Sequence, residues 1–187
     1  ALTAAQPTHA GIEFARIGDR SLKLDLYLPD QATNRRAPEA DATSHSWPLV
    51  IYVHGGAWRS GTRTKVPVLG LIEHGYAIAS VDYRLSPEAR FPAQVHDIKA
   101  AIRFLQTHAE QFSLDSHRIA ICGSSAGGHL AALVGVTNGH KELEGDVSSV
   151  DVNREENSPD AKMQPANVRA IVSFYGASNL ETILNQS

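Results

Sequence analysis

Cysteine is almost absent from this sequence, which has one, Cys122, in 187 residues. A single cysteine cannot build a disulfide framework or a cysteine-rich metal site, so we expect neither. Long hydrophobic runs are missing as well, because the apolar stretches are a few residues long and a membrane-spanning helix needs roughly 20. Basic charge is not in excess: 17 Lys and Arg stand against 20 Asp and Glu, a net charge of −3. We therefore expect no membrane partner and no nucleic-acid partner.

The composition that remains is that of a globular domain. Hydrophobic residues make up 42% of the chain and charged residues 20%, which argues against disorder, collagen and repeat arrays. The length suffices for one well-buried core but not for two large ones, so we predict a single domain over residues 1–187. The sequence starts at Ala1 without a basic-then-apolar leader, which leaves the compartment open. We expect a secreted or periplasmic protein from which a leader has been removed, and the oligomeric state stays open.

Short apolar segments alternate with helical patterns along the chain. Two alternating segments, Gly11–Ile17 and Leu22–Leu28, predict an antiparallel hairpin. Continuous apolar runs predict buried strands at Leu49–Val53, Ala77–Val81, Ile119–Cys122 and Val168–Tyr175. Strands of this kind, separated by helices, form parallel sheets that are covered on both faces. We therefore predict the α/β class, with a mixed, mostly parallel sheet and helices on both faces.

Three helices and two long loops complete the predicted order. An apolar stripe at spacings of three and four residues predicts the clearest helix, over 95–112, with a proline at its start. A shorter helix is predicted at Pro67–His74 and ends at a glycine, and a third helix ends near Val136. Gln31–Trp47 is polar and predicts a surface loop. Residues 137–165 predict an acidic surface excursion, since residues 141–160 hold seven acidic and two basic side chains.

Gly123-Ser124-Ser125-Ala126-Gly127 fits the G-x-S-x-G pattern, with Ser125 at its centre. The pattern follows a predicted strand and opens a predicted helix, which is the arrangement of a nucleophile elbow. On so sharp a turn the neighbouring chain passes close by, so a side chain at Gly123 or Gly127 would collide with it. The turn would lift the Ser125 hydroxyl above the sheet edge, where ligands bind in open α/β folds. The N–H of Ala126, at the helix N-terminus, is then a candidate oxyanion donor.

A phosphate-binding loop is the alternative interpretation of this glycine-rich turn. A Walker loop ends in Gly-Lys-Ser or Gly-Lys-Thr, and the same place holds Gly-Gly-His here. A basic residue is missing and Ser125 is centred between glycines, which favours the nucleophile. Ser124, directly before it, is a candidate pocket residue.

The other side of the oxyanion hole is predicted at His54-Gly55-Gly56-Ala57-Trp58, directly after a predicted strand. Two glycines let backbone N–H groups turn toward a substrate without obstruction, and Gly55 is expected to make the turn possible. We assign the N–H groups of Gly56 and Ala57 as donors. His54 is expected to brace the loop rather than to act as a base. Trp58 is expected to pack against the loop, or to line the pocket for the acyl group or the leaving group of the substrate.

Three segments together resemble a known family: HGGAW at 54–58, DYRLSPEARFPAQVHD at 82–97 and GSSAGGHL at 123–130. They are similar to α/β-hydrolases of the hormone-sensitive-lipase-like group, and most of all to its bifunctional feruloyl and acetyl-xylan esterases. The resemblance covers most of the chain, from about residue 12 to residue 184. It implies a serine carboxylesterase that acts on short acyl esters without a cofactor, with acetylated or feruloylated plant polysaccharide as a candidate substrate. Kynurenine formamidases share a similar HGG-x-W loop, so a formamidase or amidase is the neighbouring alternative.

The family pattern also implies a buried ion pair between Arg84 and Asp97. We expect this pair to be structural, because a buried charge is costly when it is unpaired. His96 and Asp97 are therefore not candidates for a catalytic triad. Two X-Pro bonds lie in the same short connection, and we predict that Ser86–Pro87 or Phe91–Pro92 is cis.

The acid and the histidine of a triad have no clear candidates in this sequence. In α/β-hydrolases both follow the nucleophile along the chain. No histidine follows His140, and the later aspartates all precede the last predicted strand. His129 lies four residues after Ser125, but we expect a packed helix histidine one turn below the hydroxyl. We therefore expect the C-terminal part of the domain to be missing from this chain, and to exist as a second chain or as a region outside the structure.

The last predicted strand raises the same expectation. A sheet that ends at Gly176 leaves Val168–Tyr175 as an unpaired apolar edge, which is an aggregation hazard. We expect the missing segment to cover this edge, and a small ester, with acylated carbohydrate as one candidate, to be the substrate. Because the acid and histidine are missing, a non-catalytic binding protein or an inactive fragment with this fold is the alternative from another class.

Overall fold

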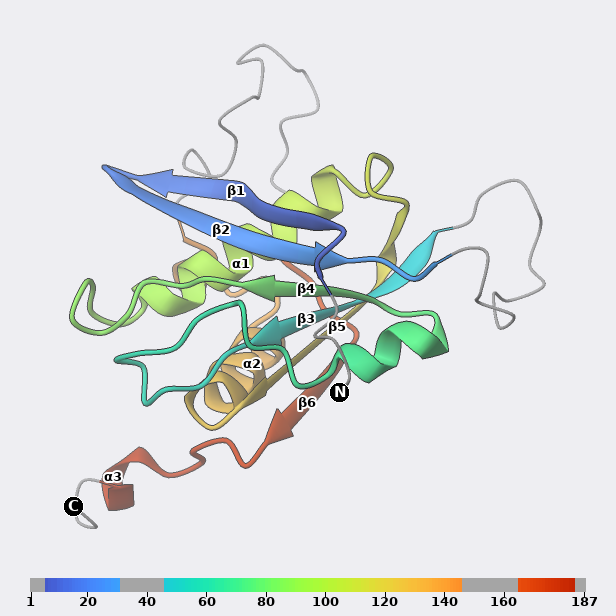
Figure 1. Ribbon diagram of the computed structural model, residues 1–187. Helices are drawn as coiled ribbons and strands as arrows, with labels where there is room; N and C mark the ends of the chain where they lie inside the picture. Colours follow the sequence, from blue (N-terminus) through green and yellow to red (C-terminus); the bar gives the residue numbers. More distant parts are fainter. Residues whose placement is uncertain (1–5, 31–45, 146–164, 184–187) are drawn as a thin grey trace.

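The computed structural model describes residues 6–30, 46–145 and 165–183 (Figure 1). Within these ranges six strands form one sheet, in the order β1-β2-β4-β3-β5-β6. The strands are β1 (His9–Ile17), β2 (Arg20–Tyr27), β3 (Trp47–Val53), β4 (Ala77–Val81), β5 (Leu114–Ser124) and β6 (Ala170–Phe174). The β1–β2 and β2–β4 pairs are antiparallel, whereas β4, β3, β5 and β6 run parallel. The predicted α/β class, with a mixed, mostly parallel sheet and a leading hairpin, is confirmed.

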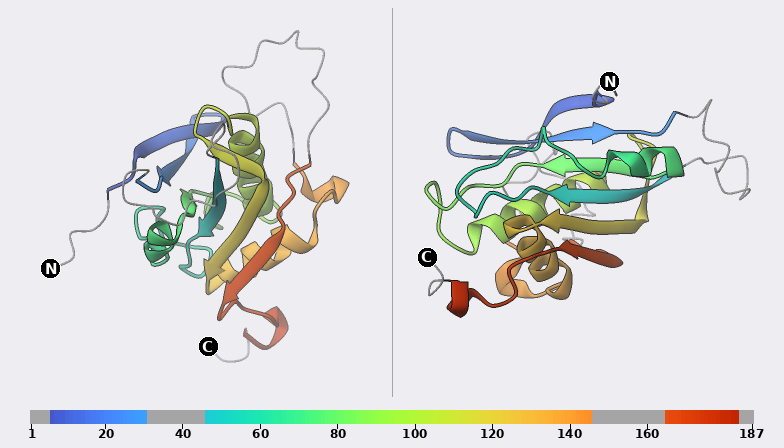
Figure 2. Two further views of the ribbon diagram at one scale, coloured as in Figure 1. Left: turned by 90° about the vertical axis from the view of Figure 1, so that its right-hand side faces the viewer. Right: turned by 60° about the horizontal axis from the view of Figure 1, so that its bottom comes forward.

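Helices cover both faces of this sheet (Figure 2). α1 (Ala93–Thr107) and α2 (Ala126–Val136) bury their apolar sides in the larger core, with Ile98 and Leu130 at most 1% exposed. The 3-10 helix η1 (Leu69–His74) covers the opposite face, where its apolar side chains pack against a smaller cluster around Tyr52 and Ile78. Two short elements follow, η2 (Lys141–Leu143) and α3 (Leu180–Ile183). No helix in the described ranges has the length and apolar character of a membrane span.

The ends of several elements differ from the predicted ones. α1 ends at Thr107, although Ala109 and Phe112 beyond it are 8% and 6% exposed. Their apolar spacing marked burial rather than continuation of the helix. β3 begins at Trp47, whose N–H donates to the Ser113 carbonyl at 2.8 Å, so the predicted loop ends before this residue. Residues 31–45 of that loop lie outside the described residues.

The segment predicted as a helix at Pro67–His74 is the six-residue 3-10 helix η1. Gly75 ends it in the left-handed region, with φ 82°, and its N–H donates to the Ile72 and Leu71 carbonyls. The glycine stop was predicted correctly, because a residue without Cβ adopts this conformation at little cost.

β6 is more exposed than the sequence predicted. Ile171, Val172 and Phe174 are 39%, 46% and 41% exposed, and β6 pairs with β5 alone among the described strands. A continuous apolar run is typical of a strand covered on both faces, but no described element lies beyond this one. The structure thus shows the open apolar edge that the sequence predicted, and the segment expected to cover it stays a prediction.

One residue of the predicted acidic surface excursion is buried. Glu144 is 2% exposed and accepts hydrogen bonds from Lys99 Nζ at 2.6 Å and from Arg103 Nη1 at 2.9 Å. Lys99 and Arg103 project from α1 and are 0% and 5% exposed, so two cations surround one carboxylate. Composition suggested a solvated segment, but these two cations on the neighbouring helix offset the free-energy cost of burying the Glu144 carboxylate. Residues 146–164 of the excursion lie outside the described residues.

The connection between β4 and α1 agrees with its predictions. Arg84 and Asp97 form an ion pair, with Arg84 Nη2 2.7 Å from Asp97 Oδ1, and Asp97 is 1% exposed. The Arg84 N–H also donates to Asp97 Oδ2 at 2.8 Å, so the carboxylate holds the connection in place. Of the two X-Pro bonds, Phe91–Pro92 is cis.

Candidate active site

Ser125 occupies the turn between β5 and α2, with φ 54° and ψ −122°. An L-residue rarely adopts these angles, and the strain is typical of functional turns. Two hydrogen bonds hold the turn: the Ser125 N–H donates to the Phe174 carbonyl, and the His129 N–H donates to the Ser125 carbonyl, both at 3.0 Å. Ser125 itself is exposed. The fold therefore presents its hydroxyl outward at the carboxyl edge of the parallel strands, as the motif predicted.

The two outer glycines of the motif leave no room for a side chain. A Cβ on Gly123 would lie 2.3 Å from the Gly127 carbonyl oxygen, and a Cβ on Gly127 would lie 2.1 Å from the Val53 carbonyl oxygen. Real Cβ atoms do not approach backbone this closely. The predicted steric reason for both glycines is thus confirmed.

The HGGAW loop lies against the serine turn. A Cβ on Gly55 would be 2.8 Å from the Ser124 carbonyl oxygen and 3.4 Å from Ser125 Cβ. The loop then curls through three residues of positive φ, Gly56 at 116°, Ala57 at 52° and Trp58 at 59°. Gly55 is therefore required for close approach to the serine turn, whereas the turn itself is made by the residues that follow it.

The candidate oxyanion donors lie on the two sides of this contact. Gly56 and Ala57 are exposed, and Ala126 is the first residue of α2. Within the described part of the chain, the N–H groups of Gly56 and Ala57 have no protein acceptor. Free N–H groups beside an exposed hydroxyl, together with the N-terminus of a helix, can stabilise negative charge on a bound oxygen.

His54 is buried beneath the loop, with 5% exposure. Its Nδ1 donates to the Gly55 carbonyl at 2.8 Å, and its ring stacks on Tyr83 at a centroid distance of 4.4 Å. Tyr83 Oη in turn donates to the His54 carbonyl at 3.0 Å. Burial lowers the pKa of His54, so the ring is neutral at neutral pH. These contacts fit the predicted bracing role. Tyr83 lies in the 82–97 segment, but its support of His54 was not predicted from the sequence.

Ser124 is not one of the pocket residues, although the sequence made it a candidate. Its Oγ is 3.0 Å from Tyr52 Oη, toward the face of the sheet that η1 covers. Successive residues of a strand point to opposite faces, and Ser124 is the last residue of β5. The Ser124 hydroxyl is therefore hydrogen-bonded to Tyr52 within the fold.

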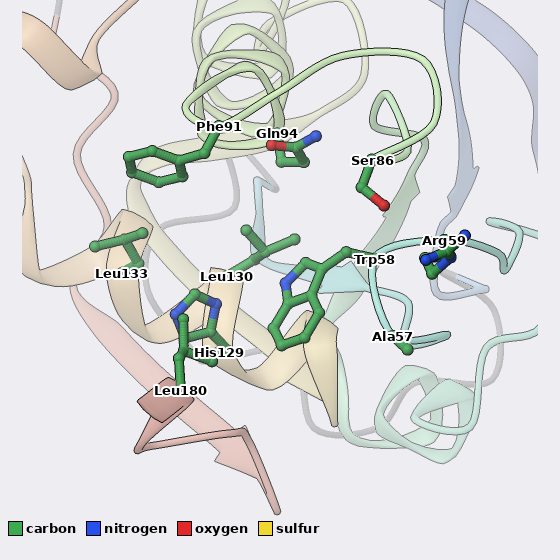
Figure 3. Close-up of a pocket in the computed structure, with 10 residues that line it drawn as sticks. All are labelled: Ala57, Trp58, Arg59, Ser86, Phe91, Gln94, His129, Leu130, Leu133 and Leu180. Carbon is green, nitrogen blue, oxygen red and sulfur yellow. The ribbon is translucent and has the colours of Figure 1, made fainter. Parts of the chain in front are cut away.

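A pocket of about 480 Å³ adjoins the HGGAW loop (Figure 3). Its walls come from that loop and the residue after it, from the connection to α1, from the start of α1, from α2 and from α3. The lining residues are Ala57, Trp58, Arg59, Ser86, Phe91, Gln94, His129, Leu130, Leu133 and Leu180. Trp58 lines it, as predicted. His129 was predicted to be a packed helix histidine, but it is half-buried and faces Trp58 edge-on, at 5.4 Å and 86°. Most of the other lining residues belong to the three segments that carried the family resemblance, but only the fold shows that these segments meet around one pocket.

The family of this chain follows from a comparison with known proteins. The BD-FAE family model matches residues 24–187, which is most of the sequence. The chain belongs to the BD-FAE family of α/β-hydrolases. The resemblance to feruloyl and acetyl-xylan esterases that the motifs carried is thus confirmed at the level of the family.

Curated relatives of this BD-FAE chain include two esterases of Mycobacterium tuberculosis. The carboxylesterase NlhH is 39% identical over 141 residues, which cover 66% of this chain and 44% of NlhH. The esterase LipQ is 33% identical over 172 residues, which cover 90% of this chain and 35% of LipQ. The chain thus spans less than half the length of these relatives.

Solved structures show the same fold. A truncated carbohydrate esterase from gut microbiota aligns with a TM-score of 0.67 and 30% identity, over 92% of the BD-FAE chain and 59% of its own chain. A bifunctional GH43-CE protein of Bacteroides eggerthii aligns with a TM-score of 0.64 and 33% identity, over 82% of this chain and 19% of its own.

The described residues of the BD-FAE chain place no base beside the nucleophile. Ser125 Oγ makes no hydrogen bond there, and no imidazole ring in these ranges forms a hydrogen bond or a salt bridge with a carboxylate. The same residues hold no group of three His, Cys, Asp or Glu side chains that could bind a metal ion. The described site therefore consists of the serine, the backbone donors and the adjoining pocket.

Proposed function

We propose that the whole protein is a carboxylic ester hydrolase that works through an acyl-enzyme on Ser125. The observation that carries this proposal is the exposed Ser125 in a strained turn, with the backbone of Gly55 packed against it. The names of the relatives, a carboxylesterase and an esterase, support the same chemistry.

The reaction proceeds in two steps. Ser125 Oγ attacks the ester carbonyl and transfers its proton to a histidine from outside the described residues. The N–H groups of Gly56, Ala57 and Ala126 donate to the tetrahedral oxyanion. The C–O bond to the alcohol breaks, the histidine returns the proton to the alcohol, and water then hydrolyses the acyl-enzyme. Each such donor typically contributes about a hundred- to a thousandfold in rate.

The candidate substrates are short-chain acyl esters, with acetyl or feruloyl esters of plant polysaccharide among them. The family match and the carbohydrate esterase among the solved structures support this class. A formamidase or amidase is the second candidate, because the HGG-x-W loop is present. Parallel assays on aryl esters, acetylated xylan and formyl amides distinguish these activities.

Fluorophosphonate labelling tests the nucleophile directly, since an activated serine reacts and an inert one does not. We expect the whole protein to be labelled and Ser125→Ala to lose both label and turnover while staying folded. Ser124→Ala is the matched control, because Ser124 Oγ contacts Tyr52 rather than the site. Full turnover by Ser125→Ala refutes the assignment, and an unlabelled, inactive whole protein supports a non-catalytic binding protein instead.

A further inference from the structure

The pocket beside the HGGAW loop is almost wholly apolar at one end. Figure 3 shows Phe91, His129, Leu133 and Leu180 on one side of Trp58, with Arg59 and Ser86 on the other. The cavity of about 480 Å³ is ample for a ring, since an apolar cavity of about 150 Å³ binds benzene. Ala57, a candidate oxyanion donor, lines this pocket, so a group attached to an ester carbonyl that is held by this N–H can enter it.

His129 brings polar atoms into these apolar walls. Its Nδ1 is buried and has no hydrogen-bond partner in the described structure. Its Nε2 also has no protein partner in the described residues, but this atom is not buried and remains accessible to a ligand. Gln94 is different, because its amide Nε2 already donates to the Ala89 carbonyl at 2.8 Å.

This geometry determines where the proton of the imidazole resides. Neutral imidazole carries one hydrogen, and the nitrogen without it is an acceptor. A hydrogen on Nδ1 would bury a donor with no acceptor, which costs more than leaving an acceptor unpaired. We therefore assign the hydrogen to Nε2. Burial lowers the pKa of His129, which keeps the ring neutral at neutral pH.

We propose that His129 determines specificity: its Nε2–H donates a hydrogen bond to an acceptor atom on the otherwise apolar group of the ester that fills this pocket. The acceptor is an ether or carbonyl oxygen or a ring nitrogen. The ring of His129 stands at 86° to Trp58, so the two rings form a corner that fits a flat group. This inference rests on the proposed ester hydrolysis and adds the chemistry of the bound group.

The test uses ester pairs that differ by one acceptor atom. One series varies the acyl group, with 4-nitrophenyl 3-phenylpropanoate against its three pyridyl isomers. The other varies the alcohol, with benzyl acetate against the pyridylmethyl acetates. Slightly alkaline pH keeps the pyridine rings uncharged. The readout is the ratio of kcat/KM for the best pyridyl ester to that for its phenyl counterpart, so effects of a variant on folding or on chemistry cancel.

We expect His129→Leu to lower this ratio about three- to tenfold in one of the two series, the effect of one lost hydrogen bond. His129→Gln, which keeps an amide donor, retains most of the ratio. His74→Leu, at an exposed histidine of η1 outside the pocket, leaves it unchanged. His129→Phe keeps a ring beside Trp58 and replaces the leucine variant should that one not fold.

An unchanged ratio in both series overturns the role of His129 while ester hydrolysis itself stands. Failure of the proposed function has a different signature, because the whole protein then hydrolyses no ester of either series and takes up no fluorophosphonate.

Discussion

Gly55 lies so close to Ser125 that it has no room for a side chain: a Cβ added at Gly55 would lie 3.4 Å from Ser125 Cβ and 2.8 Å from the Ser124 carbonyl oxygen. The loop that carries the candidate oxyanion donors therefore takes its position from the serine turn itself. Two motifs some 65 residues apart in the sequence therefore lie side by side here.

Gly55→Ala is expected to lower kcat/KM by about a hundredfold, because the new methyl group pushes the loop and its N–H groups away from Ser125. Ester hydrolysis by the whole protein measures the effect. Gly70→Ala is the control, since a Cβ at this position meets nothing within 4 Å. Equal activity of the two variants would show that the loop does not depend on this contact.

Tyr83→Phe is expected to lower the free energy of unfolding by about 1–3 kcal/mol, because the His54 carbonyl loses the hydrogen bond from Tyr83 Oη. The phenyl ring keeps the stacking on His54. Urea unfolding measures the change, with Tyr76→Phe, at a tyrosine that is 40% exposed, as the control. A loss no greater than that of the control variant contradicts the bracing role.

Glu144→Gln is expected to destabilise the fold by about 3–5 kcal/mol, since Lys99 and Arg103 are left as buried cations without a carboxylate. Urea unfolding near neutral pH measures this loss. Glu142→Gln, at an exposed neighbour, should lose almost nothing. Equal stability of both variants would mean that the buried cluster does not need its negative charge.

Acid should weaken the wild type through the same carboxylate. Burial raises the pKa of Glu144, but the hydrogen bond and charge of Lys99, the Ala166 N–H and the charge of Arg103 together outweigh burial, and the pKa lies below its usual range. A depressed pKa contributes stability that is fully present above the ordinary glutamate range and is lost as the pH falls through the folded-state value. The stability difference between wild type and Glu144→Gln should therefore shrink in acid. A difference that is constant with pH contradicts this account.

Cys122 is expected to be inert in the folded protein. It is 3% exposed, and burial raises the pKa of its thiol to about 11, so little thiolate forms near neutral pH. A colourimetric thiol reagent should react with it only after denaturant is added. Rapid stoichiometric reaction under native conditions would show that β5 opens readily.

The order of the elements and the elbow could be predicted because their signals are local. The glycines at 123 and 127 reflect a turn within five residues, and the strand before it is a continuous apolar run. The ends of the elements were harder to predict from the sequence. Phe112, for example, fits the apolar stripe and is buried, but it lies beyond the end of α1. Apolar spacing reports which side chains face the core, but not where the backbone leaves the helix.

The sequence by itself determined the α/β class, the serine turn and the glycine loop, because periodicity and steric demand act between residues that are close along the chain. Only the tertiary structure decided the rest: the pocket, the burial of Glu144 and the engagement of Ser124 with Tyr52. Each of these depends on which strands and helices become neighbours. Contacts between segments 45 to 72 residues apart leave no periodic trace in the order of amino acids.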